Sequence, residues 1–303
     1  MAVVEQRSRK SVTRALPKVR RMNFRFGEPA PMKKHYVEGD IVFSHLVSLL
    51  SGVFPPGEES FIRSVRNYSD QITDPVLKKR VAAFIGQEAM HGREHRKLND
   101  QIVNMGYPLV RLMNFEEGSR REKFVLALEK RIPKIAHLAG TAAAEHYTAV
   151  LAERVLSSSE LQEIPMSDEV HHLLNWHAME EMEHKSVAFD VYRAVGGPES
   201  VRIGVMSAIW LGTLPVMTLA VLGSILTDRS GWKPVSVLRQ TIDLYRGPLV
   251  KGLMRDIAVY LRPGFHPDDV DTNALLDEWQ KILFGAEGEL NDRLPTRATA
   301  AGQ

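Results

Sequence analysis

The stretch WHAMEEMEHKSVAFD, residues 176–190, places His177, Glu181 and His184 at successive intervals of four and three residues. At about 3.6 residues per turn, side chains at these intervals lie on one face of a helix. Soluble helices often carry charged residues on a solvated face, so this stretch alone fits a surface helix as well as a metal site. Matching residues elsewhere in the chain decide between the two.

A second stretch, QEAMHGREH, repeats the Glu-x-x-His spacing with Glu88 and His91. A four-helix bundle that binds two metal ions in its core uses such a pair from each of two helices and one glutamate from each of the other two. Glu58 precedes the first pair, and Glu145 lies between the two pairs. The order Glu, Glu-x-x-His, Glu, Glu-x-x-His therefore predicts a dinuclear metal site.

Charge balance favours such a site, because four glutamates would neutralise two divalent ions. Without a cation, each buried carboxylate would cost several kcal/mol of desolvation. Glu145 lies in TAAAEHYTAV, a nearly uncharged stretch in which a carboxylate needs a partner. Ligands with oxygen and nitrogen but no sulfur suit iron or manganese and also allow zinc. We therefore expect two iron ions as cofactors, with manganese or zinc as alternatives.

Neighbouring residues extend the site. His177 shares a helical face with Glu181 and is expected to be a third histidine ligand. His95 and Glu180 are expected to hydrogen-bond to ligands rather than to bind metal, although Glu180 also suits a solvated face. We expect no catalytic residue beyond the metal ligands. The expected ligands are Glu58, Glu88, His91, Glu145, His177, Glu181 and His184.

Composition sets wider limits on the molecule. The 303 residues, 44% hydrophobic and 25% charged, suffice for one large domain or two small ones. A net charge of +2 gives no reason to expect nucleic acid as a partner. The chain has no cysteine, which excludes disulfides and thiolate ligands and fits the cytoplasm. No apolar stretch follows the first basic residues, so no secretory signal is predicted.

The helical pattern predicts an all-α protein, specifically a ferritin-like four-helix bundle with a dinuclear metal core and additional C-terminal helices. Helices are expected at 40–51, 58–72, 74–106, 115–156 with a kink at Pro133, 168–196, 234–261 and 272–284. The expected organisation is a basic arm at 1–26, the metal-binding bundle at 27–200, C-terminal helices at 201–290 packed on the bundle or on a membrane, and a flexible tail at 291–303.

Two segments raise the question of membrane contact. Eight basic residues and no acid lie between Arg7 and Arg25, so the arm could contact anionic lipid or serve as a solubilising tail. Residues 203–227 carry no charge and are long enough to cross a bilayer. Pro215 and three glycines in that segment fit equally well with a buried, bent helix or a hairpin. Association with a membrane surface therefore stays open.

The chain resembles the bacterial family of predicted metal-dependent hydrolases from about Val19 to Asp268. Four motifs carry this resemblance: FPPGEESFIRSVR, FIGQEAMHGREHRKLN, WHAMEEMEHKSVAFDVY and RPGFHP. That family is similar in its metal motifs to ferritin-like di-iron proteins. The resemblance implies the same seven ligands, with Glu58 rather than Glu59 turned inward. The His-x-x-x-Glu-x-x-His spacing that begins at His177 resembles the arylamine N-oxygenases, in which an extra histidine joins the ligands of two irons.

The leading functional hypothesis is a di-iron oxidase or oxygenase that activates dioxygen on a small hydrophobic substrate, with an unidentified electron donor. One alternative is a dinuclear hydrolase that acts through a metal-bound hydroxide. A second alternative is metal storage or a structural metal site. The chain has no Gly-x-Ser-x-Gly elbow and no glycine-rich nucleotide motif, and a homodimer is compatible with the pattern.

Overall fold

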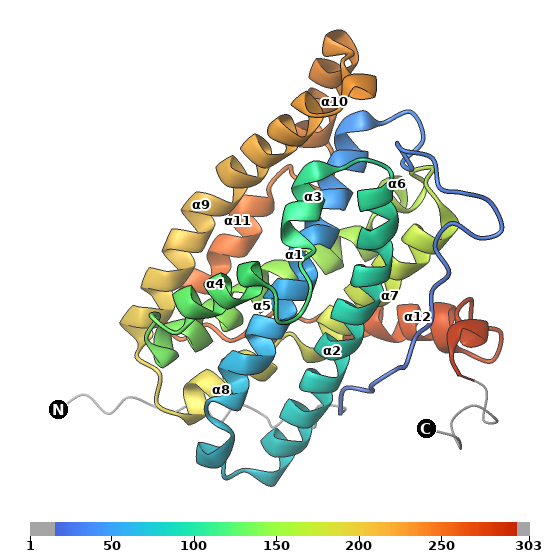
Figure 1. The fold of residues 1–303 in the computed structure, drawn as a ribbon. Coiled ribbons are helices and arrows are strands. Elements are labelled where there is room, and N and C mark those ends of the chain that lie inside the picture. The colour runs from blue at the N-terminus through green and yellow to red at the C-terminus, as the bar shows by residue number, and fades with distance from the viewer. Residues whose placement is uncertain (1–15, 296–303) are drawn as a thin grey trace.

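The computed structural model describes residues 16–295, and within this range its regular structure is helical, with no β-strand (Figure 1). The all-α class expected from the sequence is confirmed. The α-helices are α1 (Ile41–Arg66), α2 (Pro75–Asn104), α3 (Pro108–Met113), α4 (Arg120–Glu129), α5 (Lys134–Ser157), α6 (Ser159–Gln162), α7 (Asp168–His184), α8 (Val187–Ala194), α9 (Glu199–Leu226), α10 (Pro234–Arg246), α11 (Leu253–Ile257) and α12 (Asn273–Phe284).

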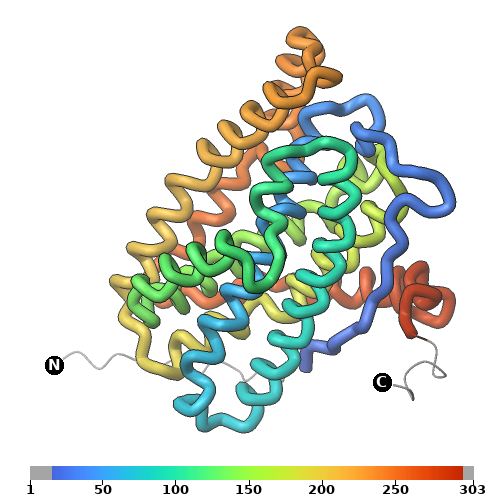
Figure 2. Tube along the Cα trace, viewed as in Figure 1, coloured from blue at the N-terminus to red at the C-terminus, as the bar shows by residue number. Residues whose placement is uncertain are grey.

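Helices α1, α2, α5 and α7 form the centre of the molecule. Helix α1 packs against α2 and α5, and α7 packs against α5 and α2. The Cα trace in Figure 2 shows α1 and α2 side by side, joined by a short connection at one end, so the two helices run antiparallel. Helix α9 lies along one flank, where it packs on α5 and α1.

Two apolar clusters occupy different levels along these central helices. On α2, Phe84 belongs to one cluster and Leu98 to the other. On α5, Ala143 and Ala152 are divided between the clusters in the same way. The helical turns between them carry the glutamates and histidines identified from the sequence, so a polar layer lies between two apolar ones.

Side-chain caps set the helix starts that the sequence predicts. The carboxylate of Asp40 accepts from the backbone N–H of Phe43 at 2.8 Å and begins α1. Asp74 accepts from Val76 in the same way and is followed by the proline that begins α2. Gly106, with φ of 90°, follows the C-cap residue of α2, Met105, in a left-handed conformation that favours glycine.

The expected break between residues 51 and 58 is wrong, because α1 continues through Pro55 and Pro56. A proline has no N–H to donate to the carbonyl four residues earlier. For Pro55 that carbonyl belongs to Ser51, and it accepts instead from Asn99 Nδ2 of α2 at 2.9 Å. This contact between helices replaces the lost bond, so Glu58 lies in the middle of a long helix.

Three other boundaries also differ from the expected ones. Pro133 separates α4 from α5 instead of kinking a single helix. The region 234–261 is divided after α10, where Pro248 and a left-handed Gly252 with φ of 79° interrupt the helix. The region 168–196 is divided after His184, where the sequence contains neither proline nor glycine.

The segment of residues 16–40 crosses the bundle instead of extending away from it. Met22 and Phe24 are buried, and the ring of Phe24 lies 5.7 Å from that of Trp176. The described part of the expected basic arm is therefore packed against α2 and α7. The other basic positions of that arm, Arg7, Arg9, Lys10 and Arg14, lie outside the described residues.

Helix α9 continues without a break through Pro215, so the hairpin, one of the alternatives left open by the sequence, does not occur there. Leu211 and Leu219 on its outer side are 66% and 70% exposed, which rules out a fully buried helix. Among the described residues, α9 is the one helix long and apolar enough to cross a membrane by its length and composition.

Gly197→Ala tests the packing of the turn from α8 into α9. An added Cβ would lie 2.4 Å from ring atoms of Tyr192, a buried side chain whose hydroxyl donates to the carbonyl of Pro198. Overpacking of this kind costs about 1–3 kcal/mol, so we expect the melting temperature to fall by about 2–8 °C. The control is Gly204→Ala, where nothing lies within 4 Å of the new Cβ. Equal melting temperatures for the two variants would contradict the packing.

Candidate metal centre

The structure brings all seven expected ligands together between α1, α2, α5 and α7. Each of these residues is at most 4% exposed. Helix α1 supplies Glu58, α2 supplies Glu88 and His91, α5 supplies Glu145, and α7 supplies His177, Glu181 and His184.

Six of these residues form two groups, each with ligand atoms close enough together to hold one metal ion. In each group the nitrogen and carboxylate atoms all lie within 4.8 Å of one another. The first group is Glu58, His91 and His177, and the second is Glu88, Glu181 and His184.

Glu181 lies between the two groups. Its Oε1 atom is 2.9 Å from His177 Nε2 and 3.7 Å from His91 Nδ1, both in the first group. The same oxygen is 3.5 Å from His184 Nε2 in its own group. Glu145 adds a fourth carboxylate, with Oε2 at 3.3 Å from His184 Nε2. A carboxylate in this position could contact metal ions in both groups.

Three of the four carboxylates lack the hydrogen-bond donors that burial demands. Neither side-chain oxygen of Glu58, Glu88 or Glu145 has a hydrogen-bond partner among residues 16–295. An ionised carboxylate buried in this way costs several kcal/mol unless a cation or hydrogen-bond donors compensate. With Glu181 the carboxylates carry four negative charges, which two divalent cations would neutralise. The donor set of oxygen and nitrogen atoms therefore fits divalent metal ions.

Hydrogen bonds outside the centre determine which nitrogen of His184 faces it. His184 Nδ1 lies 3.0 Å from Gln87 Oε1, and the amide nitrogen of Gln87 donates to Glu183 Oε2 at 2.7 Å. An amide oxygen can only accept, so Nδ1 carries the hydrogen of the neutral ring. Nε2 then presents its lone pair to the carboxylates, as a metal-binding histidine does.

His91 is oriented in the same way by Glu180. The distance from His91 Nε2 to Glu180 Oε2 is 3.1 Å, which leaves Nδ1 facing the centre. Glu180 is fully buried, so it does not lie on a solvated face. Its other oxygen accepts from Arg20 at 2.8 Å, and this arginine comes from the N-terminal segment. Glu180 thus orients His91, and Arg20, which also pairs with Glu183, offsets part of the cost of burying Glu180.

A chain of hydrogen bonds orients His177. Ser51 donates to Asn99 Oδ1 at 2.7 Å and so accepts from His95 Nδ1 at 2.9 Å. His95 Nε2 then accepts from His177 Nδ1 at 2.8 Å. This order leaves the lone pair of His177 Nε2 directed at the centre. His95 therefore lies behind His177 as seen from the centre, and its role in support of a ligand stays a prediction.

The shifted pKa values of the buried glutamates and of His184 also indicate that the centre is stabilised by positive charge. Burial and the surrounding carboxylates raise the pKa of Glu58 and Glu88 well above the ordinary value, and burial raises that of Glu145 to about 7. Burial alone would also raise the pKa of Glu181, but His184 lowers it well below the ordinary value. Against the effect of burial, the carboxylates raise the pKa of His184. Either a proton on His184 or a metal ion can supply the charge.

Two neighbours shape the space around the carboxylates. Gly92 leaves room for Glu58, since a Cβ at this position would lie 3.1 Å from Glu58 Oε2. The hydroxyl of Thr148 donates to Glu181 Oε2, which directs the other oxygen toward the two groups. Glu59, the neighbour of Glu58, turns away from the centre and pairs with Arg96.

An apolar pocket with a volume of about 130 Å³ reaches the centre at His177 and Glu181. Phe54 lines the pocket and contacts His177 edge-on, with ring centroids 4.7 Å apart. Aliphatic side chains form much of its wall, including Leu46, Val47, Leu50, Leu151, Val155 and Leu174. The pocket therefore suits an apolar group and excludes water from one side of the centre.

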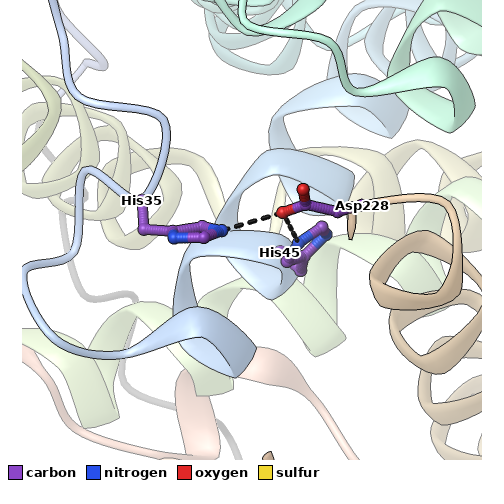
Figure 3. A group of neighbouring side chains, drawn as sticks. All are labelled: His35, His45 and Asp228. Carbon is purple, nitrogen blue, oxygen red and sulfur yellow. Dashed lines mark hydrogen bonds and ion pairs between the residues drawn. The ribbon is translucent and has the colours of Figure 1, made fainter. Parts of the chain in front are cut away.

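A third group with ligand-like spacing lies at the end of α9, as Figure 3 shows. The Nε2 atoms of His35 and His45 point at the same oxygen of Asp228, at 2.8 and 3.3 Å. Lys34 Nζ lies 2.7 Å from the other oxygen and balances the single negative charge. Burial would raise the pKa of Asp228, but the hydrogen bond from Lys34 helps to lower it. We therefore assign this group to anchoring α9.

Apart from His95 and Glu180, the residues that orient the histidines were not predicted from the sequence. Asn99 lies four residues after His95 on α2, so helical spacing could have suggested its place in that layer. For Gln87 and Ser51 no sequence pattern indicated a role beside the histidines. Arg20 was assigned to the basic arm because its partner is 160 residues away in the sequence.

Comparison with family models gives one match, a family described as "Predicted metal-dependent hydrolase", over residues 18–271, which is more than half of the chain. Comparison with curated proteins and with solved structures gives no match. The matched range includes the whole centre, from Arg20 in the outer layer to the pair on α7.

Glu181→Gln tests whether one carboxylate serves both groups. Because Glu181 Oε1 lies between the two groups, we expect this variant to lose both bound ions, whereas Glu58→Gln should lose one. Elemental analysis of protein purified by gel filtration measures the metal content per chain. The matched control is Glu59→Gln, which alters a carboxylate outside the centre. Full metal content in Glu181→Gln would contradict the arrangement.

Glu145→Gln tests the cost of the buried charge in metal-free protein. Burial raises the pKa of Glu145 from 4.5 to about 7, so the folded state keeps a proton that the unfolded chain releases. The wild type should therefore lose stability as pH rises through this interval. At pH 8 we expect the variant to have the higher free energy of unfolding, by up to about 3 kcal/mol, and at pH 5 a difference near zero.

Urea unfolding with a chelator present, at pH 5 and pH 8, measures this difference. Glu160→Gln serves as the control because Glu160 is exposed on α6. A difference between wild type and Glu145→Gln that does not change with pH would contradict the account.

Proposed function

Because this chain belongs to the family of predicted metal-dependent hydrolases, we propose that it hydrolyses an ester or amide bond with two divalent ions held between α1, α2, α5 and α7. The observation that carries the proposal is the pair of ligand groups on either side of Glu181. Divalent ions lower the pKa of a coordinated water and polarise the carbonyl that is attacked. Both effects suit hydrolysis at neutral pH.

The expectation of a dioxygen-activating oxidase is corrected by the family match, which describes a hydrolase. The expectation of an oxidase came from the ligand spacing, from oxygen and nitrogen donors that suit iron, and from the resemblance to arylamine N-oxygenases. Carboxylates and histidines in this pattern bind metal ions for either chemistry, so the spacing does not distinguish them. A hydrolase requires neither dioxygen nor an electron donor.

The proposed ligands are the seven residues expected from the sequence. Their distribution supports a ferritin-like arrangement, since α1 and α5 each give one glutamate while α2 and α7 each give a Glu-x-x-His pair. The additional His177 belongs to the first group together with Glu58 and His91. Oxygen and nitrogen ligands of this kind suit iron, manganese or zinc.

The other residues of the site position the substrate and keep water away. The apolar pocket would hold the hydrophobic part of the substrate, with the bond to be cut near His177 and Glu181. Phe54 covers the rings of His177 and His95 and closes the centre on that side. Thr148 lines the same pocket and holds Glu181, so it connects substrate binding with the geometry of the ligands.

Thr148→Val tests this connection. The substitution keeps the shape of the side chain and removes its hydrogen bond to Glu181, so we expect kcat/KM for p-nitrophenyl butyrate to fall by about 10–100-fold. Metal affinity should fall with it. Thr213→Val is the matched control, because among residues 16–295 the Thr213 hydroxyl donates to the carbonyl of Ile209 within α9 and has no contact with the centre.

The assay also separates hydrolysis from oxidation. Chelator-treated protein should be inactive and should recover on addition of manganese, zinc or ferrous iron. The rate should be equal in air and under argon, because hydrolysis uses no dioxygen. The proposed hydrolase function is overturned if no metal-loaded form of the protein hydrolyses any ester or amide substrate.

A further inference from the structure

The outer side of α9 carries an unbroken apolar stripe. Its residues are exposed and recur at intervals of three or four, which places them on one face of the helix. Leu211, Leu219 and Leu226 are 66%, 70% and 70% exposed. The full stripe is Ala208, Leu211, Pro215, Leu219, Leu222 and Leu226. Soluble monomers rarely expose so continuous an apolar surface, which marks an interaction site.

Helix α10 lies across a groove from α9 and carries a second exposed apolar row together with positive charge. Val235, Leu238 and Ile242 are 82%, 64% and 40% exposed, at helical intervals of three and four. Arg239 and Arg246 each follow one of these residues by four positions, so they share its face. Trp232, between α9 and α10, is 64% exposed, and tryptophan is enriched where a membrane meets water.

The exposed charges in this region are almost all basic. Between residues 227 and 251 the exposed acidic residue is Asp243, and the exposed basic residues are Arg229, Lys233, Arg239, Arg246 and Lys251. No ion pair links any of these five side chains to an acid within the described part of the chain.

The protein holds α9 against the bundle at both ends. Near its start, buried Arg202 donates to the carbonyl of Arg262 at 3.0 Å and pairs with Glu199. At its far end, Asp228 is bound by His35 and His45, as Figure 3 shows. In between, Trp210 donates to a carbonyl near α11 at 2.7 Å. A helix fixed in this way presents one side outward and does not cross a membrane alone.

We propose that the outer face of α9 and α10, defined by the stripe and by Val235, Leu238, Ile242 and the five basic residues, docks on the surface of an anionic lipid bilayer. Its leucines would enter the boundary between headgroups and acyl chains, and its basic residues would contact anionic headgroups. The chain thus lies on the membrane rather than spanning it.

Charge argues for a bilayer rather than a second copy of the chain. In a two-fold dimer formed through this face, the same five basic residues of each copy would approach those of the other. The region has a single exposed acid to set against them. An anionic bilayer offers the complementary charge over the whole face, together with an apolar layer beneath.

The docking face also lies next to the candidate metal centre. A groove between α1, α9 and α10 is lined by Leu214, Met217, Val221 and Leu244. Leu46 lines both this groove and the pocket that reaches His177. If the hydrolase function proposed above holds, the side chain of Leu46 separates an apolar substrate in this groove from the pocket that reaches the site.

Flotation of the full-length protein with vesicles tests the docking face. Wild-type protein should float with phosphatidylcholine vesicles that contain phosphatidylserine, and 1 M salt should weaken this binding. Two double variants test the apolar and the basic part of the face separately. Each should lower the affinity for these vesicles by at least about tenfold: Leu211→Glu with Leu219→Glu, and Arg239→Glu with Arg246→Glu. All four residues are exposed, so these variants should fold, which the melting temperature checks.

Val76→Glu is the matched control, because Val76 is 61% exposed at the start of α2 and outside the docking face. Basic residues before position 16 could also attract lipid, so the deciding comparison is among variants of the same full-length chain. Chelator-treated protein should bind vesicles equally well, which keeps this result separate from any failure of the hydrolase assay. The proposal is overturned if both double variants bind vesicles as tightly as the wild type does. It is also overturned if the wild type binds no vesicles and instead forms a dimer that Leu219→Glu dissociates.

Discussion

Four carboxylates meet between α1, α2, α5 and α7, where almost no solvent reaches them. Ionised groups in such a place repel one another and lose their hydration, and the raised pKa of Glu58, Glu88 and Glu145 expresses both costs. Positive charge at the centre removes these costs. Buried acids in this arrangement fit the metal dependence that the family description gives.

The remainder of the bundle keeps this centre in a binding geometry. Gln87, Glu180 and His95 each accept a hydrogen from one histidine, so that all three rings turn a lone pair inward. The N-terminal segment contributes Arg20, which pairs with Glu180 from outside. Apolar clusters on either side of the polar layer exclude water, and the pocket leaves one apolar approach. On the flank, α9 remains anchored while its outer face stays exposed.

Local spacing explains what could be predicted from the sequence. The Glu-x-x-His pairs on α2 and α7 needed only the helical repeat, and caps such as Asp74 marked helix starts. Contacts between residues far apart in the sequence could not be predicted from helical spacing. Helix α1 continues past Pro55 because Asn99 on another helix supplies the missing donor. The exposure of α9 depends on which helices cover it. The reaction type was mispredicted because the same ligands serve oxidation and hydrolysis.

Anomalous X-ray diffraction from crystals of metal-loaded protein tests the central claim most directly. Data collected at the absorption edge of the bound metal should show two peaks inside the bundle, one in each group beside Glu181, at about 2.0–2.2 Å from the ligand atoms. Absence of any peak there, or a peak only at His35, His45 and Asp228, would show that the buried carboxylates do not serve a metal centre.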